Sequence, residues 1–109
     1  MKGFIGEFEE LVLLTIATLG SDAYGVAIKE AIELRANRTI SIGALHSTIS
    51  RLEDKGYITS HLGGATAERG GRRKRFFDLT SDAKEALNAI KTLRDGLWRE
   101  SKIDLRFSK

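Results

Sequence analysis

The residues best suited to chemistry form a basic cluster between Arg69 and Arg75. Five of these seven residues are Arg or Lys, and the other two are glycines. Long cationic side chains on a glycine-containing loop suit phosphate contacts, because the loop can adapt its shape to a groove. A plainer interpretation is a solvated charged hairpin, but five cations without an acid would repel one another unless an anion were present. The cluster therefore favours DNA contacts by Arg69, Arg72, Arg73, Lys74 and Arg75.

A second set of candidates lies between Ser41 and Lys55, where helical spacing separates an apolar stripe from a polar face. The expected buried stripe consists of Ile42, Leu45, Ile49 and Leu52. The opposite face is small, polar or basic, which suits close approach to base edges and phosphates but also suits water. Its position directly before the basic cluster favours DNA. The candidate contacts on this face are Gly43, Ala44, His46, Ser47 and Arg51, with Thr48 at its edge.

Catalysis and metal binding find little support in the residue types. The chain has two histidines, His46 and His61, and no cysteine, whereas a zinc site normally needs three or four protein ligands. Adjacent acids such as Glu53 and Asp54 point in different directions on a helix, so they do not form a catalytic pair. The glycine pairs lack the Gly-Lys-Ser/Thr order of a phosphate-binding P-loop. We therefore expect no enzyme activity, no metal and no cofactor.

The composition is that of one folded domain with no sign of secretion. The 109 residues are 41% hydrophobic and 30% charged, which is typical of a globular protein rather than a disordered chain. The longest apolar run, from Leu11 to Ala17, is too short to span a bilayer, and the N-terminus does not resemble a signal peptide. A cytoplasmic location without a membrane partner is expected. The net charge of +3 adds little, so the local clustering of cations carries the argument for a nucleic-acid partner.

Hydrophobic periodicity and turn residues predict the elements that position these candidates. Helical spacing covers residues 6–19, 23–36, 42–55 and about 81–104, while β-branched and aromatic residues predict strands at 57–62 and 75–79. Suitable N-caps are Asp22, Ser41 and either Thr80 or Ser81, and Gly56 suits the end of the third helix. The expected fold is mainly α with a small β-hairpin. Three helices followed by a hairpin form a winged helix-turn-helix layout, whose third helix enters the major groove.

The last predicted helix carries an apolar stripe that a small three-helix core cannot easily cover. We expect a second copy to bury it, so that residues 81–109 form a dimerisation helix attached to a DNA-binding domain of residues 1–80. Trp98 lies at the edge of the stripe, where it either packs in the dimer or lines a pocket for a flat or cationic effector. The predicted interface residues are Ala83, Ala86, Leu87, Ile90, Leu93 and Leu97.

Four segments together resemble PadR-like transcriptional regulators, in the short form with a single C-terminal helix. They are residues 6–14, 22–28, 41–56 and 68–80, which read GEFEELVLL, DAYGVAI, SIGALHSTISRLEDKG and ERGGRRKRFFDLT. The resemblance implies a winged helix dimer that represses transcription by binding an operator. His46 stands where the family commonly has Tyr, and Ala83 stands where Gly is common, so local differences are expected at both positions. The larger C-terminal dimerisation domain of the longer members is expected to be absent.

The favoured function is sequence-specific binding to double-stranded DNA by a homodimeric regulator, a repressor acting on a palindromic operator. The alternative is a winged helix module that binds protein or RNA without recognising an operator, because a fold alone does not determine a function. The basic cluster and the polar face of the third helix favour DNA. The expected partners are double-stranded DNA, a second copy of the chain and a small aromatic effector.

Overall fold

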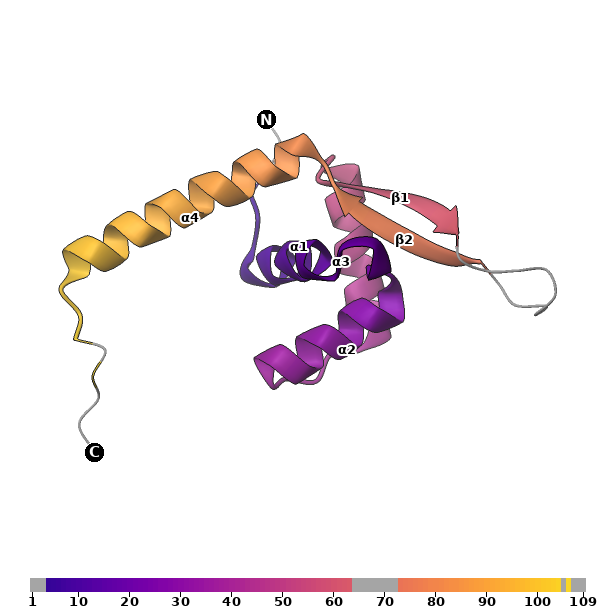
Figure 1. Cartoon of the computed structure of the whole chain (residues 1–109), viewed down its shortest axis with the longest axis horizontal. Coiled ribbons are helices and arrows are strands. Elements are labelled where there is room, and N and C mark those ends of the chain that lie inside the picture. The colour runs from indigo at the N-terminus through magenta and orange to yellow at the C-terminus, as the bar shows by residue number, and fades with distance from the viewer. Residues whose placement is uncertain (1–3, 64–72, 105, 107–109) are drawn as a thin grey trace.

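The fold is mainly helical with one β-hairpin, which confirms the fold class predicted from the sequence (Figure 1). The structure is a computed structural model, and it describes residues 4–63, 73–104 and 106. In chain order its elements are α1 (Glu7–Leu19), the short 3-10 turn η1 (Gly20–Asp22), α2 (Gly25–Ala36), α3 (Ile42–Asp54), β1 (Ile58–Gly63), β2 (Lys74–Leu79) and α4 (Ser81–Ser101).

The hydrophobic core lies where α1, α2 and α3 meet beside the hairpin. Helix α1 supplies its centre, because Val12, Leu13 and Ile16 are almost fully buried. Burying each large aliphatic side chain contributes about 1.5–3 kcal/mol, so this core accounts for much of the stability of the domain. Among the described residues, the buried hydrophobic core consists of Val12, Leu13, Ile16, Ala23, Ile28, Ile32, Ile40, Leu45, Ile49, Leu52, Tyr57, Ile58, Phe77 and Ala83.

The hairpin is attached to the helical core at its base. Strands β1 and β2 are antiparallel, with a register that runs from Ile58 opposite Leu79 to Gly63 opposite Lys74. The segment before α2 adds a third short pairing, because Phe77 N–H donates to the Ala23 carbonyl at 2.9 Å. Burial of Phe77 in the core then fixes how the hairpin lies relative to α3.

Local signals explain where the helices begin and end. The Ser41 hydroxyl accepts a hydrogen bond from the Ala44 N–H at 3.0 Å, which caps α3 as predicted. Gly56 follows that helix with a φ of 80°, a conformation that glycine adopts without strain. The prediction that Asp22 caps α2 is wrong. Asp22 belongs to η1, and α2 begins only after Tyr24, because Ala23 and Tyr24 pair with β2 first.

Helix α4 leaves the domain as an arm. Thr80 caps its start by accepting from Ala83 N–H at 3.2 Å, and the Thr80 hydroxyl also donates to the Gly56 carbonyl at 2.7 Å. The helix has 21 residues and spans roughly 32 Å, and its far end points away from the three-helix core (Figure 1). The radius of gyration is 16.6 Å, against roughly 13 Å for a compact chain of this length.

Candidate nucleic-acid interface

The outward face of α3 matches much of the predicted reading surface. Gly43, Ala44, His46 and Ser47 are exposed, while Leu45, Ile49 and Leu52 anchor the helix in the core. A Cβ atom added to Gly43 would meet no other atom within 4 Å. No neighbouring group of the described chain therefore requires glycine at this position, which leaves room for the close approach of another molecule.

Thr48 and Arg51 differ from the expectation. Thr48 has only 2% of its surface exposed, and its hydroxyl accepts a hydrogen bond from Arg51 Nη2 at 3.1 Å. The prediction that Thr48 lies at the edge of the exposed face is therefore wrong, because this side chain is buried in the domain. Arg51 remains exposed, but its Nε donates to Glu9 Oε2 at 3.4 Å. Its charge is thus partly balanced within the chain.

Glu9 ties the N-terminus of α1 to the end of α3. Its carboxylate accepts from the Gly6 N–H at 2.9 Å, and Lys55 Nζ lies 3.0 Å from Oε2. Burial alone would raise the pKa of Glu9, but the Gly6 N–H, Lys55 and Arg51 together hold that pKa below its usual value. The carboxylate is therefore charged at neutral pH, and it holds Arg51 of α3 and the following Lys55 in place.

Contacts on both sides hold the start of β2 next to α2 and α3. Lys74 Nζ lies 4.1 Å from the centre of the Tyr24 ring, a cation–π contact with the residue before α2. On the other side, Arg75 Nη1 donates to Ser60 Oγ at 2.9 Å, and Ser60 Oγ donates to Glu53 Oε2 at 2.8 Å. The orientation of the hairpin relative to α3 is therefore set by side chains as well as by the core.

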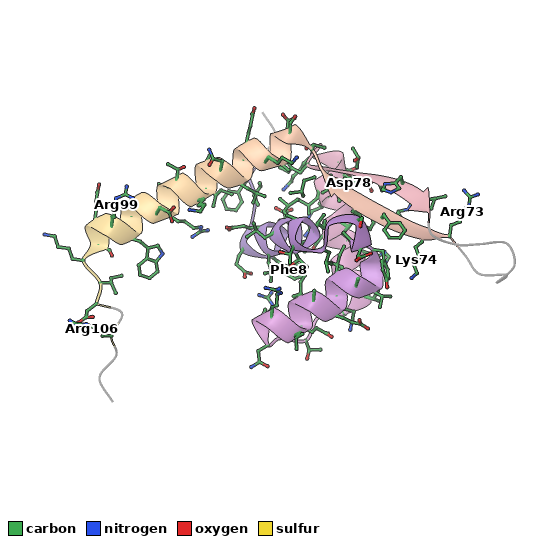
Figure 2. All side chains as sticks on the ribbon, in the orientation of Figure 1. Phe8, Arg73, Lys74, Asp78, Arg99 and Arg106 are labelled. Atoms are coloured by element: carbon green, nitrogen blue, oxygen red, sulfur yellow. The ribbon has the colours of Figure 1, made fainter. Side chains whose placement is uncertain are left out.

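Arg73 and Lys74 lie at the end of the hairpin farthest from α4 (Figure 2). Arg73, Lys74 and Arg75 are all exposed at the start of β2. Arg69 and Arg72 were also predicted to contact DNA, but both lie outside the described residues. The described part of the predicted basic cluster is thus brought beside the exposed face of α3.

A groove of about 620 Å³ runs between the start of α2, the outward face of α3 and the start of β2. The hairpin side of it is cationic, and the α3 side mixes polar and aliphatic groups. Ile42 is among the aliphatic ones, and 44% of its surface is exposed. The prediction that Ile42 is buried is wrong, because it is the first residue of α3 and lies beyond the core that covers Leu45. The groove is lined by Tyr24, Gly25, Val26, Ile42, His46, Ile49, Ser50, Glu53, Arg73, Lys74, Arg75 and Phe77.

The apolar stripe of α4 divides into two parts. Ala83 is fully buried in the core of its own chain, and Ala86 and Leu87 pack against that core. The prediction that Ala83 lies in a dimer interface is therefore wrong, because no surface of it is left for a partner. Leu93 and Leu97, farther along the arm, are 63% and 60% exposed.

A second groove, of about 670 Å³, separates α4 from α1. Leu14 and Leu87 supply apolar walls, and Arg94 Nη2 approaches Glu10 Oε1 to 3.3 Å across it. Trp98 lines this groove and also a smaller cavity of about 180 Å³ at the end of the arm. Ile90 is half-buried between the covered and the exposed parts of the stripe.

Residues 12–89 match the family described as the transcriptional regulator PadR-like family. This chain belongs to that family. It is a family of transcriptional regulators rather than of enzymes. The matched range contains α3, the hairpin and the start of α4, while Leu93, Leu97 and Trp98 lie beyond it. No curated protein sequence matches the chain.

Solved structures of PadR-like proteins have the same fold. A PadR-like transcription factor from Bacteroides fragilis is 17% identical, with a TM-score of 0.68 and 84% of each chain covered. A PadR family regulator from Clostridium difficile R20291 is 22% identical, with a TM-score of 0.66, covering 84% of this chain and 92% of that one. Bacillus subtilis PadR, solved in complex with operator DNA, is 17% identical with a TM-score of 0.60, and the match covers 97% of this chain but 55% of that one.

Several residues of this PadR-like protein gain their significance only from the structure. Glu9 is one of two adjacent acids, and nothing in their spacing shows which contacts α3. Glu53 and Ser60 are ordinary polar residues of a helix and a strand until the fold joins them to Arg75. Tyr24 could be singled out from the sequence, because it lies in one of the segments that resemble the family. The sequence does not indicate its contact with Lys74.

Within residues 4–63, 73–104 and 106, no three His, Cys, Asp or Glu side chains gather where they could hold a metal ion. None of the described helices is long and apolar enough to cross a membrane.

Proposed function

We propose that this PadR-like protein is a sequence-specific DNA-binding repressor that acts as a homodimer on a palindromic operator. The observation that carries the proposal is the groove between α2, α3 and β2, where exposed cations of the hairpin face the outward side of α3. Phosphate contacts position a protein on a duplex, and contacts with base edges specify the sequence. This groove offers side chains for both tasks in one place.

The reading surface is formed by the exposed residues of α3. His46, Ser47 and Ser50 supply hydrogen-bond donors and acceptors, and Gly43 allows the helix backbone to approach the duplex closely. Arg51 takes part from the far end of this face, where Glu9 limits the directions its guanidinium can take. Thr48 has no direct role, because it is buried.

The phosphate contacts come from the hairpin. Arg73 and Lys74 are exposed beside the groove, and the cation–π contact with Tyr24 orients Lys74 before DNA arrives. A cation held in place loses less side-chain entropy on binding than one that is free to rotate. We propose the same role for Arg69 and Arg72, because they belong to the same basic cluster of the sequence.

The arm supports the homodimer. Leu93, Leu97 and Trp98 expose apolar surface along one side of α4, and the groove between α4 and α1 continues that surface. A second copy of α4 in this groove would bury the apolar groups of both chains. The two reading helices would then face successive turns of the major groove, roughly 34 Å apart.

Trp98 is the residue at which we expect a flat aromatic effector to bind. The residue is 52% exposed and lines both cavities of the arm. Aromatic faces stack on flat rings and attract cations. Titration of Trp98 fluorescence with planar cationic compounds tests this role, and an unchanged signal would leave Trp98 as a packing residue.

Selection of bound sequences from random duplex DNA by the purified protein tests the proposed function. An enriched palindrome is expected, because two symmetric reading helices recognise two symmetric half-sites. The matched control is the same selection with a random RNA library. Absence of an enriched duplex would contradict the proposal, and enrichment of RNA instead would favour the alternative of an RNA-binding module.

A further inference from the structure

The first turn of α3 presents aliphatic groups where a reading helix usually offers hydrogen-bond groups. Its residues Ile42, Gly43 and Ala44 are all exposed, and none of their side chains can donate or accept a hydrogen bond. The Ser41 hydroxyl before them already accepts from the Ala44 N–H, which caps the helix. The first side chain of α3 that can form a hydrogen bond is therefore that of His46, one turn later.

Ile42 is the largest group in this turn. It is an exposed aliphatic side chain in the groove that also contains Lys74 and Arg75. An apolar protein partner would have to bury these cations, whereas a duplex would neutralise them with its phosphates. The charge of the groove therefore favours DNA as the molecule that covers Ile42.

The chemistry of the major groove indicates which group of the DNA bases Ile42 would contact. Residues near the N-terminus of a recognition helix contact base edges. Among the groups on those edges, the apolar one is the 5-methyl group of thymine, and the others are hydrogen-bond donors and acceptors. Placing a donor or acceptor against Ile42 would leave that group unsatisfied, which is unfavourable.

We propose that Ile42 selects thymine in each half-site by packing against its 5-methyl group. This inference rests on the proposed DNA-binding function and adds a residue that determines specificity. The contact is hydrophobic, so it discriminates by loss of a methyl contact rather than by loss of a hydrogen bond. Burying one methyl group is worth roughly a threefold to fivefold change in affinity.

Deoxyuridine removes the thymine methyl and leaves the Watson–Crick pairing unchanged, so it provides the test. The operator obtained by selection is resynthesised with deoxyuridine in place of one symmetric pair of thymines at a time. Binding is measured for the wild-type protein, Ile42→Ala and Leu34→Ala. Leu34 is an exposed leucine of α2 that does not line the groove, so its variant is the matched control.

At one symmetric pair of thymines, replacement by deoxyuridine is expected to weaken binding by the wild-type protein roughly threefold to fivefold per half-site. Leu34→Ala should show the same loss. Ile42→Ala should bind the natural operator more weakly and show no further loss at that pair. Ile42→Val, which shortens the side chain by one methylene, should fall between them. Far-UV circular dichroism checks that the variants fold, as expected since Ala suits a helix.

Two results would overturn the inference while leaving the proposed function intact. One is a wild-type protein that binds every deoxyuridine operator as tightly as the natural one. The other is an Ile42→Ala variant that keeps the full sensitivity of the wild type at every position. If selection enriches no duplex at all, the proposed function and this inference are both wrong.

Discussion

The groove beside α3 and the groove beside α4 are similar in size but differ in how they are held. The first is bounded by side chains that already contact one another, including the Glu53–Ser60–Arg75 chain and the Lys74–Tyr24 contact. The second is crossed by the exposed ion pair between Glu10 and Arg94, and apolar groups remain uncovered along the arm. The first surface is therefore organised within one chain, whereas the second needs another chain to complete it.

The largest effect is expected from a test of whether α4 needs a second chain. Leu93→Glu places a carboxylate on the exposed apolar side of α4, and we expect it to weaken dimerisation by more than about 100-fold, because burying an unpaired charge is unfavourable. Operator binding should be lost with the dimer, while the fold of each chain is retained. Sedimentation velocity at micromolar concentration measures the effect.

Thr92→Glu is the matched control for this change, because it adds the same charge at the neighbouring position of α4, off the apolar stripe. It should leave the dimer intact. A wild-type protein that is monomeric at micromolar concentration, or a Leu93→Glu variant that still dimerises, would show that the arm is complete in one chain.

The adjacent acids Glu9 and Glu10 allow the stability of the two regions to be compared, because Glu9 contacts α3 and Glu10 contacts α4. Glu9→Gln should lower the free energy of unfolding at about pH 7 by about 1–3 kcal/mol, because it weakens charge-assisted hydrogen bonds to Lys55 and Arg51. Glu10→Gln removes an exposed ion pair with Arg94 and should cost about 0–1 kcal/mol. Urea unfolding measures both.

The pH dependence follows from the lowered pKa of Glu9. A carboxyl whose pKa is lower in the folded protein stabilises it above the ordinary carboxyl pKa, and that contribution is lost as the pH falls through the lowered value. The difference between wild type and Glu9→Gln should therefore shrink as the pH falls through and below the ordinary carboxyl range. A difference independent of pH would mean that the charge of Glu9 does not stabilise the fold.

The cations of the hairpin test whether the first groove contacts phosphates. Arg73→Ala and Lys74→Ala should each reduce the slope of log affinity against log salt by roughly 1, on operator and random DNA alike. Arg35→Ala is the control, because Arg35 is an exposed arginine of α2 that lines neither groove. Unchanged slopes for both hairpin variants would show that the hairpin does not touch DNA.

Two helical glycines, one in each region, are positions where a substitution should give a small gain in stability. Gly43 and Gly96 both have space for a Cβ, since the nearest atom to the one at Gly96 is Arg99 Nη2 at 3.8 Å and none is found near Gly43. Replacing either by Ala should raise the free energy of unfolding by up to about 1 kcal/mol. Only Gly43→Ala should weaken operator binding, because only there does DNA need the space.

Thermal unfolding and operator titration of the same two variants separate stability from function. If Gly43→Ala binds the operator as well as the wild type, close approach at this position is not required. A loss of binding for Gly96→Ala would instead link the arm to DNA recognition through the dimer.

The sequence predicted the elements well where the signal is local. Ser41, Gly56 and Thr80 lie at helix ends because their own backbone and side-chain chemistry suits those positions. The apolar periodicities gave the helices and the β-branched and aromatic runs gave the hairpin, since each pattern reflects the geometry of one element. The start of α2 was misplaced because Ala23 and Tyr24 pair with a strand that lies about fifty residues later in the chain.

By itself, the sequence determined the element order, the clustering of cations beside the third helix and the amphipathic character of the last helix. Only the tertiary structure decided which polar groups are already occupied and which aliphatic groups remain free. It buried Thr48, bound Arg51 to Glu9, exposed Ile42 and placed Ala83 in the core of its own chain. The physical reason is that burial and pairing depend on neighbours from other elements, and helical periodicity locates a residue only on its own helix.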